Sequence, residues 1–200
     1  ESLANESTFE TLKLIDKEHP DLIKCLSKNG LALKEKAEEL SSLGVRTVTV
    51  TVNALDEEIA EKVYSWISFD KQILKGKEAS RRLLERQWQG IQEAKKADII
   101  IKLNTVLIPE INKYELEKIA LKGKDYGVDL MNIIPLIPLN KFKELKPPTC
   151  DEISEAREKA GKYLPQFKLC RQCRADAVGI PGHDSDYHKE RRSDSEYFHG

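Results

Sequence analysis

Four short runs of apolar and β-branched residues are spaced along the chain, and each has the length and composition of a β-strand. They cover residues 22–27, 46–52, 99–107 and 128–135. Gly, Pro or Asn bounds each run, as is typical of strand ends. Because most positions in these runs are apolar or alternate apolar residues with Thr, the pattern predicts four strands that flanking helices bury.

Amphipathic stretches with apolar residues at helical spacing lie before, between and after these runs. The sequence contains neither G-x-G-x-x-G nor G-x-x-x-x-G-K-[ST], the phosphate loops of a doubly wound nucleotide-binding sheet. Strands that alternate with helices indicate βαβ units and a parallel sheet. We therefore predict an α/β fold, a partial (β/α) TIM-like barrel over residues 1–165, with a C-terminal segment over 166–200. The predicted helices cover 5–18, 33–43, 56–66, 77–97, 113–125 and 150–163.

Composition narrows the class of protein. Of 200 residues, 40% are hydrophobic and 34% charged, which is enough for a core. Lys plus Arg number 33 and Asp plus Glu 34, so the net charge of −1 argues against a general nucleic-acid binder. No apolar run approaches the roughly 20 residues of a membrane span. The first residues show no secretory signal, so we expect a cytoplasmic protein with reduced thiols.

Three asparagines lie in predicted strands or directly after one, and the chemistry of parallel α/β folds collects at the carboxyl ends of such strands. Asn53 ends the second strand, Asn104 lies in the third and Asn132 in the fourth. We predict that Asn53 and Asn104 face one polar cavity at the carboxyl edge of the sheet. The alternative is that these amides satisfy one another and the loop backbone.

The four cysteines are of different kinds. Cys170-Arg-Gln-Cys173 is a C-x-x-C pair, which suits one metal or cluster, although a redox pair or no role remains open. Cys25 is placed near the carboxyl end of the first strand on its polar face, where composition alone favours a buried structural thiol. Nothing converges on Cys150. The tail that holds His183, His188 and His199 is expected to be a mobile terminus.

Several runs of the sequence resemble one known family. They are Glu1–Asn5, Leu26–Gly30, Val45–Ala54, Tyr64–Trp66, Lys102–Asn112, Asn132–Pro138 and Leu164–Gly179. Together they are similar to the NifB family of nitrogenase cofactor-maturation enzymes, which are radical S-adenosylmethionine (SAM) barrels. The similarity extends from residue 1 to about residue 179, and its most specific part is Cys-Arg-Gln-Cys-Arg-Ala-Asp-Ala from Cys170 onward.

The resemblance implies a lyase-type radical SAM enzyme. Such an enzyme couples two [4Fe-4S] clusters, with a carbide taken from SAM and an extra sulfur, into the [8Fe-9S-C] precursor of FeMo-co. It implies SAM and a radical-generating [4Fe-4S] cluster as cofactors, and the two further clusters as substrates. The implied partners are cluster-delivery and cofactor-carrier or scaffold proteins, not nucleic acid or a membrane. The same resemblance implies that Cys170 and Cys173 bind one substrate cluster and that Cys25 binds the other. It also implies three contacts to SAM: Glu1 and Ser2 end the element that holds the amino group, Asn53 contacts the ribose, and Asn104 contacts the amino-acid end.

The sequence departs from this family in one respect. The family's C-x-x-x-C-x-x-C motif, which binds the radical-generating cluster, does not occur among the four cysteines. We therefore expect a piece that lacks the first strands of its barrel, is inactive alone, and resembles the short form without a carrier domain. Two alternatives are another radical SAM enzyme with an auxiliary cluster and a non-enzymatic iron–sulfur scaffold or carrier.

Overall fold

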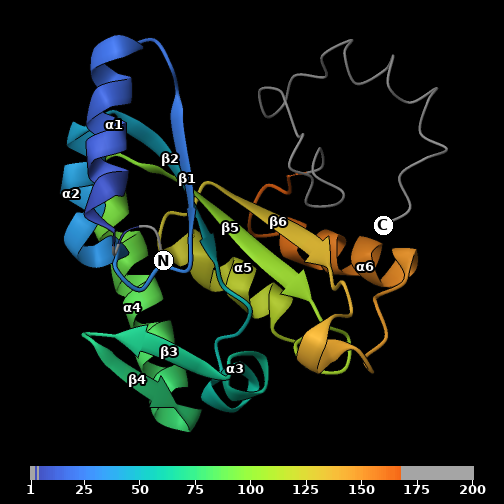
Figure 1. Cartoon of the computed structure of the whole chain (residues 1–200). Coiled ribbons are helices and arrows are strands. Elements are labelled where there is room, and N and C mark those ends of the chain that lie inside the picture. Colours follow the sequence, from blue (N-terminus) through green and yellow to red (C-terminus); the bar gives the residue numbers. More distant parts are fainter. Residues whose placement is uncertain (1–2, 4, 168–200) are drawn as a thin grey trace, which may run out of the picture.

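Four parallel strands form the main sheet, in the order β1-β2-β5-β6 (Figure 1). The computed structural model describes residue 3 and residues 5–167. The strands are β1 (Lys24–Lys28), β2 (Val45–Thr51), β5 (Ile100–Leu107) and β6 (Leu130–Pro135), and every pairing between neighbours is parallel. The predicted strands and the partial TIM-like barrel are confirmed.

Helices alternate with the strands as predicted. They are α1 (Glu6–Glu18), α2 (Leu33–Ser42), α3 (Glu57–Val63), α4 (Gly76–Lys96), α5 (Leu116–Asp125) and α6 (Cys150–Gly161), with a short 3-10 helix, η2 (Asn140–Phe142). Side chains cap three of the helix starts. Asn5 accepts from the N–H of Ser7 at α1, Asp56 accepts from the N–H groups of Glu58 and Ile59 at α3, and Thr149 forms a reciprocal capping box with Glu152 at α6. In the part of the chain that the structure describes, no helix is long and apolar enough to cross a membrane.

One element differs from the prediction. The third helix was expected to continue to Trp66, but α3 ends at Val63 and an antiparallel hairpin follows. Its strands are β3 (Trp66–Phe69) and β4 (Gln72–Lys75), and Figure 1 shows them apart from the main sheet. Its two turn residues, Asp70 and Lys71, have φ values of 49° and 60°. A tight turn of this kind usually carries Asn or Gly, so residues 70 and 71 show no hairpin signal.

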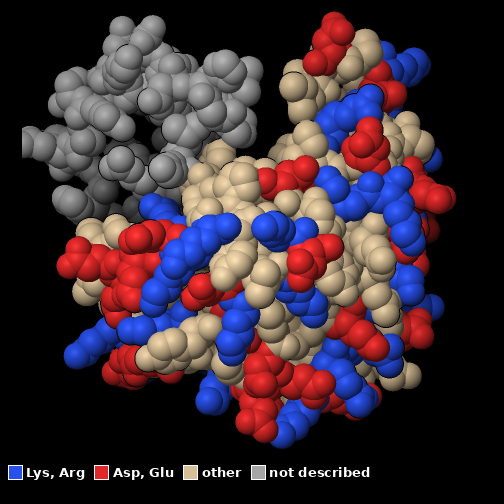
Figure 2. Space-filling view, turned by 180° about the vertical axis from the view of Figure 1, so that it is seen from behind, with Lys and Arg blue, Asp and Glu red and all other residues tan. Residues whose placement is uncertain are grey.

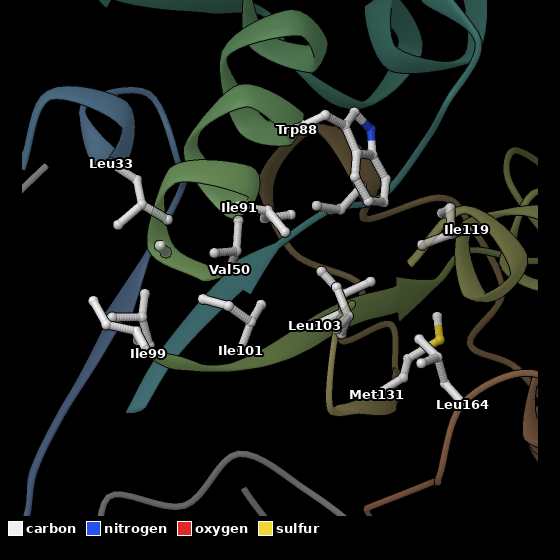
Figure 3. Packing of buried hydrophobic residues seen from close by; sticks show 14 of the residues in the cluster. Leu33, Val50, Trp88, Ile91, Ile99, Ile101, Leu103, Ile119, Met131 and Leu164 are labelled. Carbon is white, nitrogen blue, oxygen red and sulfur yellow. The ribbon is translucent and has the colours of Figure 1, made fainter. Parts of the chain in front are cut away.

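The helices pack on one face of the sheet. Val50, Ile101 and Leu103 point from β2 and β5 toward Trp88 and Ile91 of α4 (Figure 3). Because side chains alternate along a strand, the residues between them lie on the opposite face. That opposite face, called the polar face below, carries Cys25, Ser27, Thr47, Thr49, Thr51, Lys102, Asn104 and Asn132.

The chain returns to the sheet after α6. The N–H of Met131 donates to the carbonyl of Pro165 at 2.9 Å, and the N–H of Phe167 donates to the carbonyl of Met131 at 2.8 Å. Gln166 forms a parallel bridge with Met131. The first residues of the predicted C-terminal segment therefore run alongside β6, at the level of Asn132.

Charged side chains are mixed by sign over the helical side of the molecule. Figure 2 shows Lys and Arg interspersed with Asp and Glu on the face seen from behind. A protein that binds a nucleic-acid backbone usually gathers Lys and Arg on one surface. The face in Figure 2 carries no such surface.

Close contact between α2 and α4 depends on Gly90. A Cβ at this position would lie 2.8 Å from Leu33 Cβ and 3.2 Å from the backbone nitrogen of Lys34. Gly→Ala normally stabilises an exposed helix by about 1 kcal/mol. We expect Gly90→Ala to lower the stability of the full-length protein by about 1–3 kcal/mol, because the two helices must move apart. Thermal unfolding measures the change, with the exposed Gln92→Ala in the same helix as control, and a stabilised Gly90→Ala variant would contradict the packing.

Candidate functional site

Two asparagine side chains meet on the polar face. Asn104 on β5 lies opposite Asn132 on β6, and the Asn132 amide nitrogen donates to Asn104 Oδ1 at 2.9 Å. Asn132 is only 2% exposed, and its Oδ1 has no hydrogen-bond partner among the described residues. A buried acceptor without a partner costs about 1–3 kcal/mol. The pair therefore holds one buried acceptor whose hydrogen bond is not made within the described part of the chain.

The positively charged side chain of Lys102 lies on β5, beside Asn104. Lys102 precedes Asn104 by two residues, so both side chains leave the same face of β5. Lys102 Nζ lies 4.8 Å from the centre of the Phe167 ring, and no described carboxylate forms an ion pair with it. A cation held against an aromatic face without an acidic partner suits an anionic group of a ligand.

Asn53 ends the pairing between β2 and β5. Its Oδ1 accepts the backbone N–H of Val106 at 2.9 Å, while the Thr105 hydroxyl donates to the carbonyl of Val52 at 2.7 Å. Two side chains thus take over bonds that the backbone ladder would otherwise make. The structure brings Asn104 to Asn132 rather than to Asn53, and the shared cavity of Asn53 and Asn104 stays a prediction.

Two residues that the sequence analysis did not single out hold Asn53 and the loop that follows it. Asn112 is fully buried, and its amide nitrogen donates to the carbonyls of Asn53 at 2.9 Å and Val106 at 2.8 Å. Its Oδ1 accepts the N–H of Ile108 at 2.8 Å. Glu115, the second residue, follows three positions later. Both residues belong to the loop after β5, and polar residues in a loop at a strand's carboxyl end were the signal that could have found them.

Glu115 is a buried carboxylate that holds the loop after β2. It is 1% exposed, and its Oε2 accepts the N–H groups of Leu55 at 2.8 Å and Asp56 at 2.9 Å. Its Oε1 lies 3.0 Å from Lys118 Nζ. Burial by itself raises the pKa of Glu115, but the two N–H donors and Lys118 outweigh it and hold the pKa below its usual value.

Loss of the Glu115 charge should destabilise the protein. We expect Glu115→Ala to cost about 2–4 kcal/mol, because two backbone N–H groups lose a charged acceptor. A lowered carboxyl pKa contributes stability above the unfolded pKa of about 4.3, and that contribution is lost as the pH falls through the folded pKa. The difference in free energy of unfolding between wild type and Glu115→Gln should therefore be largest near neutral pH and decrease in acid. Denaturant unfolding at several pH values measures it, with the exposed Glu38→Gln as control, and a difference that is independent of pH would contradict the assignment.

The cysteines of the described part lie on two different elements, β1 and α6. Cys25 is an exposed free thiol on the polar face, opposite Thr47. The expectation that it lies near the carboxyl end of its strand is wrong, because β1 begins only at Lys24 and Cys25 is its second residue. Cys150 is exposed at the start of α6.

The other predicted site residues lie outside the described part of the chain. These are Glu1, Ser2, Cys170, Cys173 and the tail histidines His183, His188 and His199. Within residue 3 and residues 5–167, no group of three or more His, Cys, Asp or Glu side chains could hold a metal ion.

A sheet of parallel strands with helices on one face and polar groups on the other defines a partial TIM-like barrel whose inner face is the candidate site. A domain of pyruvate-formate lyase-activating enzyme from Bacteroides vulgatus shares this fold, with a TM-score of 0.61 and 14% identity over 82% of this chain and 90% of that one. The model of the radical SAM superfamily matches residues 1–122, and the chain belongs to this superfamily.

Proteins that are more similar in sequence confirm the resemblance to the NifB family. The chain is 53% identical over 180 residues to the FeMo cofactor biosynthesis protein NifB of Methanocaldococcus infernus, covering 90% of this chain and 59% of that protein. It is 51% identical over 198 residues to the protein of that name from Methanocaldococcus jannaschii, covering 99% and 63%. The chain therefore spans about three fifths of the length of these relatives.

Membership of the superfamily implies that the protein uses SAM and a [4Fe-4S] cluster as cofactors. The polar face fits SAM, because Asn104 offers an amide donor and Lys102 offers a cation to the carboxylate of a zwitterionic nucleoside. The described residues do not fit a cluster, which needs several thiolates, since Cys25 and Cys150 lie on separate elements.

Proposed function

We propose that this chain is the part of a radical SAM enzyme of FeMo-cofactor biosynthesis that lines the SAM and substrate site. The observation that carries the proposal is the polar face with its paired amides, in a chain 51% and 53% identical to proteins named NifB. The substrates would be two [4Fe-4S] clusters, joined with a carbide and an extra sulfur into the [8Fe-9S-C] precursor. Proteins that deliver clusters and carry the product would be its partners.

Each candidate residue has a role in this proposal. Asn104 would bind the amino-acid end of SAM and Asn53 its ribose, with Glu1 and Ser2 at the amino group. When bound, SAM would supply the methyl carbon and the radical. Cys25 would bind one substrate cluster, and its exposure on the polar face supports this role. Cys170 and Cys173 would bind the other.

The function is tested on the full-length protein after anaerobic purification. Iron and sulfide are counted, and 5′-deoxyadenosine formation from SAM is followed, together with conversion of added clusters into an eight-iron product. We expect bound iron, 5′-deoxyadenosine and the product. The chain of residues 1–200, which has no C-x-x-x-C-x-x-C, is the matched control and should form no 5′-deoxyadenosine.

The other functions give different results in this experiment. A scaffold or carrier would hold iron and form no 5′-deoxyadenosine. A radical SAM enzyme that acts on a peptide or nucleotide would cleave SAM but leave the added clusters unjoined. Either result would overturn the proposal.

A further inference from the structure

A long loop joins β6 to α6 at the carboxyl edge of the sheet, and Figure 1 shows it beyond the arrowhead of β6. This segment, called the β6–α6 loop below, covers residues 136–149 and contains one regular element, η2. Loops longer than about 12 residues are uncommon in a compact domain and usually carry function. Because loops at the carboxyl ends of barrel strands surround the site, this loop lies where molecules enter and leave.

The β6–α6 loop has a restricted backbone. Pro138, Pro147 and Pro148 each fix one backbone dihedral angle. Asn140 has a φ of 52°, in the left-handed region that Asn tolerates better than most residues, and it begins the turn of η2. A loop that is ordered before a partner binds loses less conformational entropy on binding.

Two hydrogen bonds attach the loop to its neighbours. Lys141 Nζ donates to Ser65 Oγ at 2.6 Å, and the backbone N–H of Lys146 donates to Glu110 Oε1 at 3.3 Å. The first bond holds the loop beside the residue that precedes Trp66, the first residue of β3. The second bond ties it to the loop after β5. The β6–α6 loop therefore has a fixed place against two neighbouring segments.

Large apolar side chains of the loop and its neighbour are open to solvent. Ile137 is 51% exposed, Leu139 62% and Trp66 57%. A single exposed apolar residue is ordinary, whereas several on adjoining segments mark an interaction site. Trp is also among the residue types that contribute most to binding at protein interfaces.

Unpaired lysines accompany these apolar side chains. Among the described residues, no carboxylate forms an ion pair with Lys141 or Lys146, and Lys143 pairs with the adjacent Glu144 at 3.6 Å. Glu144 is the one acidic residue in the loop sequence, against three lysines. A partner that carries carboxylates would meet cations that are not neutralised within the described part of the chain, which speeds association and selects that partner.

These features favour one kind of occupant. A symmetric contact between two copies of the chain places the same patch on both sides, so lysines would face lysines. An anchor that lies on a lipid surface is usually an amphipathic helix, whereas η2 spans three residues. Protein interfaces combine an apolar centre with a polar rim, which is the arrangement that the loop offers.

We propose that the β6–α6 loop, together with Trp66, is the docking surface for a transient protein partner with an acidic surface. Leu139 and Trp66 form the apolar centre of this surface, and Lys141 and Lys146 attract carboxylates around it. The inference goes beyond the proposed function, because it concerns where a partner binds and not which reaction the protein performs.

The test places a photo-cross-linking amino acid, p-benzoylphenylalanine, at position 139 of the full-length protein. The protein is made and irradiated in cells that assemble the nitrogenase cofactor, and the cross-linked peptides are identified by mass spectrometry. We expect a cross-link to a segment rich in Asp or Glu on a second protein. The matched control carries the same amino acid in place of Leu14 of α1, whose exposure of 60% is close to the 62% of Leu139, and should not give this cross-link.

Charge reversal separates a specific contact from a chance one. Lys141→Glu combined with Lys146→Glu should lower the cross-link yield about 10-fold, since opposite charges raise association rates by that factor or more. Lys13→Glu with Lys124→Glu reverses two exposed charges elsewhere and should leave the yield unchanged. Because Lys141 also bonds to Ser65, Lys146→Glu alone is the second variant, and it should lower the yield as well.

The outcomes separate this inference from the proposed function. A cross-link within this chain, to a second copy of it or to lipid would overturn the inference, and so would a yield that charge reversal leaves unchanged. A full-length protein that forms 5′-deoxyadenosine and the eight-iron product but no cross-link would overturn the inference and leave the function standing. A charge-dependent cross-link in a protein that forms no 5′-deoxyadenosine would support the inference and overturn the proposed function.

Discussion

Replacement of Cys170 and Cys173 together by alanine in the full-length protein is expected to remove about four iron atoms per chain, the content of one [4Fe-4S] cluster. Two thiolates at this spacing reach one metal centre readily, whereas a structural zinc would need two more ligands close by. SAM cleavage should continue, since it depends on a separate three-cysteine motif. Iron and sulfide analysis after anaerobic purification, with 5′-deoxyadenosine formation, measures both effects.

The matched control for this double variant is Cys150→Ala. Cys150 is an exposed thiol at the start of α6, and in the described part of the chain no second cysteine accompanies it there. Its removal should leave the iron content unchanged. Unchanged iron in the Cys170/Cys173 variant, or zinc bound in place of iron, would contradict the assignment.

Cys25→Ala is expected to abolish formation of the joined eight-iron product and to lower iron by about four atoms per chain. The thiol is exposed on the polar face that also carries the paired amides, so a cluster bound there would share that face with SAM. Cleavage of SAM should again continue. Ser27→Ala, two residues along the same face of β1, is the control and should form product. A Cys25→Ala variant with full iron and normal product would show that this thiol is not a ligand.

The sheet could be predicted because each strand has a self-contained pattern. The runs around Val48 and Ile101 combine β-branched residues with burial on one face, and helices follow each of them. The hairpin at Trp66–Lys75 could not be predicted from the sequence, because its turn uses Asp70 and Lys71 in place of Asn or Gly. The start of β1 was placed two residues early, since Leu22 and Ile23 are apolar and yet exposed before the strand begins.

The site could be predicted only in part. Asn53 and Asn104 were singled out by their places along the strands, which the sequence reveals. The bond between Asn104 and Asn132 depends on the register of β5 against β6, which no local pattern determines. The role of Glu115 depends on two loops that meet although Leu55 and Glu115 are 60 positions apart. Contacts of this range follow from the tertiary structure and not from neighbouring residues.

The way β2 separates from β5 affects how any later mutational data must be interpreted. Asn53 Oδ1 accepts the last hydrogen bond between the two strands, from the backbone N–H of Val106. The backbone carbonyl of Asn53 accepts from the side-chain amide of Asn112. A shortened side chain at position 53 would therefore loosen the seam between two strands as well as remove a ligand contact, and one kinetic defect would combine the two losses. Asn104 bonds to a neighbouring side chain and not to a strand backbone. Position 104 is thus the cleaner reporter of what the ligand contributes, and position 53 is informative only beside a measurement of folding.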